Sequence, residues 1–334
     1  MTQVAFRPEY PTLAERFVTF FRLPYVIGCG LIALVSSGVP FTLAISGSLR
    51  PFGPVDSTVY ILLVTAGLYA PRYMRARLLE AELSLSSLLP NTETDFHRLF
   101  GSVSSTKPQL LAMALFFPAV LVANLETIGT VTNSPPVLLS TIVGAVVLTL
   151  GFGSATWAYF VSLWGIHRMG STRMELRPYF EDLSLGLRPV GALAFSLAKA
   201  YFAIAGLGLV GVVVTTFSTS AYALVLAVII LGVILFFLPL FRLHQRMLQQ
   251  KMIEKDKLGN EVARVFRASS ETDSPGELTR LFKLDMMERK VSSMPVWPFN
   301  MQILGRFSII VLSVTAVLLA RIVAVYLKII IPLG

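Results

Sequence analysis

Long apolar runs separated by polar connections dominate this sequence. An α-helix needs about 20 apolar residues to cross the hydrocarbon core of a bilayer, which is ~30 Å thick. The second run is the weakest, because its purely apolar part ends at Ala70, but tyrosines flank it as interfacial anchors. The pattern predicts an all-α, polytopic bundle of seven transmembrane helices. The predicted spans are Tyr25–Ile45, Val55–Tyr73, Leu110–Leu125, Val137–Trp164, Val190–Phe217, Ala221–Phe241 and Phe307–Ile331.

The polar chain between the sixth and seventh spans predicts helices outside the membrane. The sixth helix is expected to continue through RLHQRMLQQKMIEKDKLGNEVARVF, which carries a sparse apolar stripe. The stretch ASSETDSPGE then breaks it. A new amphipathic helix is predicted from Pro275 to Ser292, because SPGE fits a capping box with proline at the first helical position.

An elbow is predicted at residues 294–300, where this helix ends. Pro295 and Pro298 stop the helix, because proline lacks the backbone donor and disfavours helix at the preceding residue. Trp297 suits the headgroup layer of the membrane. The last helix is therefore expected to be split into a polar half and a spanning half.

These boundaries divide the chain into four parts. Residues 1–24 form an N-terminal cytoplasmic segment, and residues 25–241 form a six-helix bundle with cytoplasmic loops at 74–109 and 165–189. Residues 242–305 form a cytoplasmic helical segment that contains the elbow, and residues 306–334 form the seventh transmembrane helix.

Composition and charge agree with this class of protein and orient it. Hydrophobic residues make up 54% of the chain and charged residues 14%, with a mean hydropathy of +0.71. All basic residues except Arg50, Arg321 and Lys328 fall on one side of the predicted membrane. The positive-inside rule therefore places the N-terminus in the cytoplasm and the C-terminus outside, in a multi-pass protein of the cell membrane. The net charge of +9 predicts contact with anionic headgroups rather than nucleic acid.

Apparent catalytic motifs fail on their context. The stretch GLGLVG at 206–211 matches a dinucleotide-binding pattern but lies inside a predicted spanning helix, where small residues allow close helix packing. The histidines lack metal-ligand spacing, and the single cysteine, Cys29, excludes a disulfide. We expect no enzyme activity, no catalytic residue, no metal site and no cofactor.

The seventh span carries the polar residues that predict a conduction path. Arg321 and Lys328 lie two helical turns apart and form a cationic stripe. A hydroxyl-bearing face, with leucines that could act as hydrophobic constrictions, lies nearly opposite. Its members are Ser308, Leu312, Thr315, Leu319 and Tyr326.

The two faces of this helix predict opposite ion selectivity. If the hydroxyl face lines the path, cations are preferred and Arg321 forms a buried pair with Glu126 away from the pore. If the cationic face lines it, Arg321 and Lys328 select anions. We favour the hydroxyl face because the pair leaves both charges satisfied, although a purely structural ion pair fits the same residues.

An apolar stripe on the helix from Pro275 to Ser292 predicts a contact with another helix. The stripe runs through Leu278, Leu281 and Phe282, and on to Met286 and Val291. It would be buried against another helix, either of a second subunit or of the same one.

The predicted topology resembles that of the insect odorant and gustatory receptors, which are seven-helix ion channels. The shared features are an internal N-terminus, an external C-terminus, long internal loops and a split last helix, and they cover the whole chain. The Thr-Tyr…Gln-Phe signature of that family is absent from SIIVLSVTAVLLARIVAVYLKI, and the stretches LGLRPVG, LFRLHQRM and MPVWPFN are similar to those of prokaryotic, including archaeal, membrane proteins. The resemblance implies a ligand-gated homo-oligomeric channel, a tetramer whose last helices line a central pore. It also implies that the cytoplasmic helices form an anchor that holds the oligomer together, with the stripe through Leu278, Leu281 and Phe282 as its contact.

Two other classes of function fit the same sequence. A non-conducting scaffold or signalling subunit would use the cytoplasmic helices as its working surface. A secondary transporter should show broken helices and carboxylates at the membrane midplane, and neither is evident.

Overall fold

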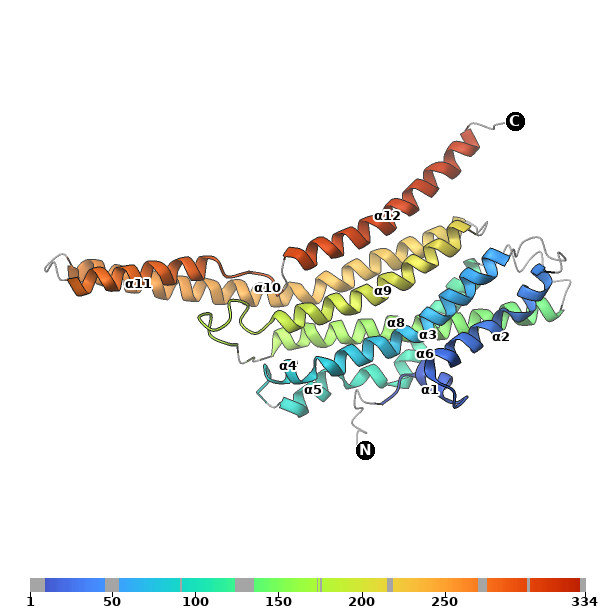
Figure 1. Ribbon diagram of the computed structural model, residues 1–334, viewed down its shortest axis with the longest axis horizontal. Coiled ribbons are helices and arrows are strands. Elements are labelled where there is room, and N and C mark those ends of the chain that lie inside the picture. The colour runs from blue at the N-terminus through green and yellow to red at the C-terminus, as the bar shows by residue number, and fades with distance from the viewer. Residues whose placement is uncertain are drawn as a thin grey trace.

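The computed structural model describes residues 10–45, 54–90, 92–123, 135–172, 174, 176–214, 219–269, 275–298 and 301–330. Within these ranges the chain is helical and contains no β-strand, which confirms the all-α prediction (Figure 1). The helices are α1 (Leu13–Thr19), α2 (Tyr25–Ile45), α3 (Pro54–Glu80), α4 (Glu82–Ser86), α5 (Thr92–Phe100), α6 (Thr106–Ala123), α8 (Pro135–Ser171), α9 (Arg188–Val214), α10 (Thr219–Ser269), α11 (Pro275–Ser292) and α12 (Met301–Ile330), with a 3₁₀ turn η1 (Gly101–Ser104).

Several of these helices have the length and composition of membrane spans. Among the described residues, four qualify: Ile142–Ser171, Arg188–Val213, Tyr222–Arg267 and Gln302–Ala320. A fifth is possible if the bent pair Thr94–Ser104 and Thr106–Val122, which meet at 40°, forms one span. The protein is therefore a helical membrane protein. The number of seven spans and the orientation of the termini stay predictions.

The connections that were predicted as cytoplasmic loops fold onto the ends of the spans. The described residues of 74–109 form the end of α3, α4, α5, η1 and the first turn of α6. Helix α5 and the turn η1 pack against α8 in the main hydrophobic core. Phe96 and Phe100 are fully buried there, and Gly165 of α8 leaves the space that the Phe100 ring fills. These short helices are therefore part of the packed core at one end of the spans and do not only connect them.

A tight turn in the second connection is organised by Asp182. Its carboxylate accepts hydrogen bonds from the Ser184 hydroxyl (2.6 Å), the Ser184 amide (2.9 Å) and the Gly186 amide (2.9 Å). Gly186 has a φ of +83°, which L-residues rarely adopt. Burial tends to raise the pKa of Asp182, but the bonds from Ser184 and Gly186 and the nearby Arg177 outweigh it and lower that pKa.

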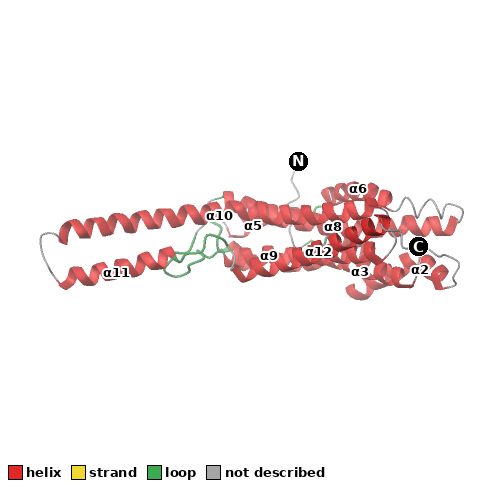
Figure 2. Cartoon of the chain, turned by 90° about the horizontal axis from the view of Figure 1, so that it is seen from above, coloured by secondary structure: helices red, strands yellow, loops and turns green. Residues whose placement is uncertain are grey.

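A long helical hairpin, which we call the stalk, projects from one end of the bundle (Figures 1 and 2). The 51 residues of α10 run from the bundle to the tip of the stalk, and α11 returns antiparallel along it. Leu258 and Val265 of α10 and Leu284 and Val291 of α11 are buried in the main core. The predictions that the sixth helix continues past the apolar run and that a new helix spans Pro275–Ser292 are confirmed.

Candidate functional site

Among the four described helices that qualify as membrane spans, α12 is the least covered. Only 11% of its most apolar 18-residue stretch is buried, against 61% of the corresponding stretch in α8. One face packs against the core, mainly through α9 and α10. That face includes Ile303, Leu304, Phe307, Ile310, Val311, Val314 and Leu318. Figure 1 shows the C-terminal end of α12 lying apart from the other helices.

The base of α12 is held by a cluster of aromatic rings. Phe307 stacks on Phe236 of α10 with ring centroids 4.1 Å apart. It also makes edge contacts with Phe202 of α9 at 5.5 Å and with Phe237 at 5.7 Å. Such pairs contribute about 0.5–1.5 kcal/mol each beyond burial of their area. The helix is thus fixed at its base and loosely covered beyond it.

Two side chains of α10 fix the elbow that precedes α12. Lys251 Nζ donates to the carbonyls of Ser292 (2.7 Å) and Met294 (2.9 Å). His244 Nδ1 lies 2.7 Å from the Val296 carbonyl, which can only accept, so this nitrogen carries the proton. Three carbonyls at the end of α11 and in the chain after it are therefore held by one helix.

The predicted elbow residues lie partly against the protein. Trp297 is half-buried and stacks on the His244 ring with centroids 4.2 Å apart. Pro298 is buried, whereas Pro295 is exposed. Trp297 therefore packs on α10 instead of serving only as a headgroup anchor. His244 binds the carbonyl of Val296, and its ring stacks on the indole of the next residue, Trp297.

The predicted pore residues fall into two groups. Ser308, Leu312 and Leu319 are exposed on the uncovered side of α12. Thr315 is half-buried at its border and donates to the Val311 carbonyl at 2.8 Å. Arg321 and Tyr326 lie in α12, but their side chains fall outside the described residues, as does the whole of Glu126. The predicted Glu126–Arg321 pair consequently lies outside what the structure describes.

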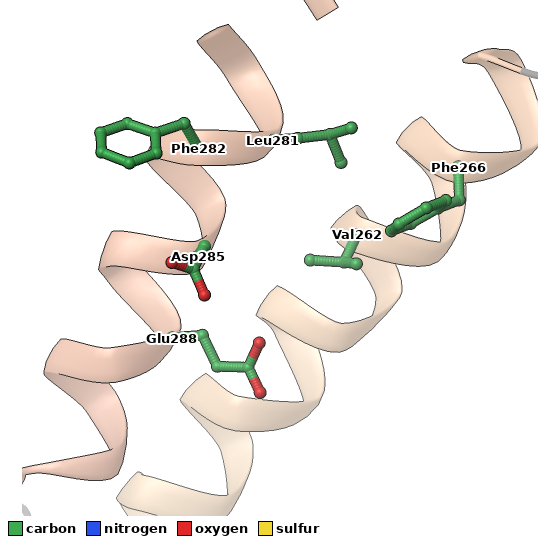
Figure 3. Close-up of a pocket in the computed structure, with 6 residues that line it drawn as sticks. All are labelled: Val262, Phe266, Leu281, Phe282, Asp285 and Glu288. Carbon is green, nitrogen blue, oxygen red and sulfur yellow. The ribbon is translucent and has the colours of Figure 1, made fainter. Parts of the chain in front are cut away.

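The predicted anchor stripe divides between two faces of α11. Leu281 packs toward α10, while Phe282 points away from it and is 65% exposed (Figure 3). The side chain of Leu278 lies outside the described residues. Adjacent residues of a helix point about 100° apart, so Leu281 and Phe282 cannot both face one neighbour squarely.

A groove of about 510 Å³ runs between α10 and α11 beside these residues. Its apolar members come from both helices, and two carboxylates lie toward one end (Figure 3). The lining residues are Val262, Phe266, Leu281, Phe282, Asp285 and Glu288. The groove combines exposed apolar area with negative charge outside the apolar runs.

Sequence reasoning missed the roles of His244 and Lys251. Their spacing of seven residues, two helical turns on one face, was the available signal. That signal names no partner, because the carbonyls that they bind lie more than 40 positions further along the chain. No group of three or more residues that could hold a metal occurs in the part of the chain that the structure describes.

Comparisons of the chain with protein-family models, with curated proteins and with solved structures found no match. The functional argument therefore rests on the residues and their geometry.

Proposed function

We propose that the protein is a homo-oligomeric ion channel in which α12 lines the conducting path. The observation that carries the proposal is the uncovered face of α12, which includes Ser308, Leu312 and Leu319. In a bundle of several copies, this face would meet water and its equivalents around a central axis. Hydroxyls interspersed with leucines suit a path whose narrow points are hydrophobic.

The arrangement of α12 also supports a gate. Phe307 and the elbow hold the base of the helix, whereas beyond Val314 only Leu318 is a buried apolar contact among the side chains described in α12. A helix fixed at one end and lightly packed at the other can adopt two tilts with a small energy difference. The elbow, held by His244 and Lys251, would transmit a movement of the stalk to that base.

Cysteine substitution in a background of Cys29→Ala tests this function. In reconstituted vesicles, Leu312→Cys should become sensitive to block by a charged thiol reagent, because the side chain at 312 faces the path. The matched control is Val314→Cys on the packed face, where Val314 lies 3.8 Å from the ideal Cβ position at Gly206 of α9. Block at 314 but not at 312 would assign the path to the other face, and no current under any ionic gradient would refute the channel.

A non-conducting scaffold or signalling subunit is the second candidate, and the stalk groove favours it. Phe266 and Phe282 leave more than half of their surface exposed beside Glu288 and beside Asp285, whose carboxylate pairs with Arg289 at 3.0 Å. An apolar patch next to negative charge suits a partner with both apolar and basic side chains. This function would be supported if the reconstituted protein passes no current and if the wild-type protein, but not the variant Phe282→Ser, forms a stoichiometric complex with such a partner.

A further inference from the structure

The short helix α1 is fixed rigidly to the bundle. Arg75 of α3 grips Glu15 with NH2 2.9 Å from Oε1 and Nε 2.9 Å from Oε2. Gln109 of α6 accepts from the Leu13 amide at 2.7 Å. On α2, a Cβ added at Gly28 would lie 2.9 Å from Val18 Cγ1, so the two helices touch closely. Contacts with three different helices therefore fix which side of α1 faces outward.

Aromatic side chains lie on the exposed side of α1 and in the two residues that follow it. Phe20 is 79% exposed, and Phe17 and Phe21 are exposed as well. The rings of Phe17 and Phe20 each meet Phe21 edge-on, at 5.9 Å and 5.6 Å. Leaving such a cluster in water is unfavourable by about 25 cal/mol for each Å² of apolar surface. The rigid mounting of α1 prevents the rings from turning inward.

This aromatic face continues into an exposed apolar surface of α2. Leu23, Val26, Ile27 and Leu31 are all exposed along the first turns after the bend. Helix α2 belongs to an apolar run that the sequence predicts to cross the membrane, so its exposed apolar surface is expected to face lipid. The aromatic face therefore lies where this apolar surface of α2 begins, and this continuity favours the bilayer as its partner.

Two arginines flank the aromatic face. Arg16 and Arg22 are exposed, and no salt bridge joins either of them to an acidic residue among those described. Arg16 Nε donates to the Pro11 carbonyl at 3.1 Å and Nη1 to the Thr106 hydroxyl at 3.4 Å, which hold the guanidinium beside α1 while the residue stays exposed. Arg22 has a φ of 55°, in the left-handed region that favours glycine. The bend that this conformation creates turns the chain from α1 into α2 and leaves Arg22 exposed directly after Phe20 and Phe21 in the chain.

We propose that α1 and the bend after it form an interfacial anchor that binds acidic phospholipids. The rings of Phe17, Phe20 and Phe21 insert at the boundary between headgroups and acyl chains, as aromatic residues of interfacial helices do. Arg16 and Arg22 bind the phosphates of anionic headgroups around them. The buried Glu15–Arg75 pair holds the rings at that depth. This binding surface is independent of whether the protein conducts ions.

A fluorophore at position 20 tests the depth of the anchor. With Cys29→Ala in place, Phe20→Cys carries a nitrobenzoxadiazole label in phosphatidylcholine–phosphatidylglycerol vesicles. Doxyl-labelled lipids should quench it, and aqueous dithionite should reduce it slowly. The control is Leu83→Cys on α4, where Leu83 is 85% exposed away from α1; its label should be reduced rapidly and quenched little.

The same label tests the selection of headgroups. Doxyl-phosphatidylglycerol should quench the label at 20 more strongly than doxyl-phosphatidylcholine at equal mole fraction. Arg22→Gly should lower this excess about fivefold, the effect of one basic residue near an anionic surface. Glycine suits the backbone at this position, so the bend should survive, and Arg22→Lys should retain the excess.

Three results would overturn the anchor. A label at 20 that behaves like the label at 83 would place α1 in water. Equal quenching by the two lipids would refute the selection of acidic headgroups. Protection from dithionite without quenching by either lipid, and dependent on protein density in the vesicle, would assign the face to a second copy of the chain.

Discussion

The ion pair between Glu15 and Arg75 should determine whether α1 stays on the bundle. The Glu15 side chain is 3% exposed and that of Arg75 is 17% exposed. Besides the contacts with Arg75, Glu15 Oε2 accepts from the Thr12 amide at 2.7 Å, which completes the capping box of α1. The substitution Arg75→Met keeps an unbranched apolar side chain but leaves the carboxylate buried without its cation.

The expected cost follows from this burial. Removing one partner of a buried ion pair destabilises a protein by about 3–5 kcal/mol, because the remaining charge is uncompensated. The cost should fall on the docking of α1, since Arg75 belongs to α3 and Glu15 to α1. An opening free energy lower by this amount speeds amide exchange roughly 10²- to 10⁴-fold, at 1.36 kcal/mol for each factor of ten.

Hydrogen exchange in detergent or nanodiscs measures this directly at the inner amide of Val18. Arg75→Met should accelerate exchange there while amides of α8 keep their protection. The double variant Glu15→Gln/Arg75→Met should recover most of the loss, because it removes the buried charge. Unchanged exchange in Arg75→Met, or a double variant as unprotected as the single one, would show that the pair does not hold α1.

Two further outcomes are expected. Phe307→Ala removes the ring contacts at the base of α12, so the distribution of distances between spin labels on α9 and α12 should broaden. The control Phe241→Ala, which removes an exposed ring, should leave that distribution unchanged. Equal distributions in the two variants would show that the rings do not hold the base of α12. The lowered pKa of Asp182 means that its turn is stabilised at pH values above the ordinary pKa of a carboxyl and loses that stabilisation as the pH falls through the lowered value. Protection of the Gly186 amide from hydrogen exchange should therefore decrease below about pH 4. In Asp182→Asn this protection should not depend on pH. A wild-type protein whose protection is independent of pH would contradict the role of the carboxylate.

Local signals in the chain predicted several elements closely. The SPGE capping box placed the start of α11 at Pro275, and the proline pair after Ser292 placed its end. The continuation of the sixth helix beyond Phe241 followed from the sparse apolar stripe along that stretch. These features depend on interactions within a few residues, such as caps and missing donors, which the order of the residues specifies directly.

The candidate site was only partly accessible in the same way. The hydroxyl face of α12 follows from helical periodicity, and Ser308, Leu312 and Leu319 are on its exposed side. Which side of α12 is covered depends instead on where Phe202 and Phe236 lie, and those rings come from two other helices. The anchor stripe shows the same limit, since Leu281 and Phe282 are equally apolar and only the position of α10 separates them.

The sequence by itself determined that this is a helical membrane protein, where α11 begins and ends, and which residues share each face of a helix. The reason is that apolar run length and periodicity are properties of contiguous residues in contact with lipid or water. The tertiary structure alone decided that Arg75 meets Glu15, that Lys251 and His244 hold the elbow, and that the faces of α1 and α12 stay uncovered. The two members of each of these pairs lie 41 to 60 residues apart in the sequence. Any cationic side chain can bind many carbonyls or carboxylates, and the packing of whole helices determines which one lies within reach.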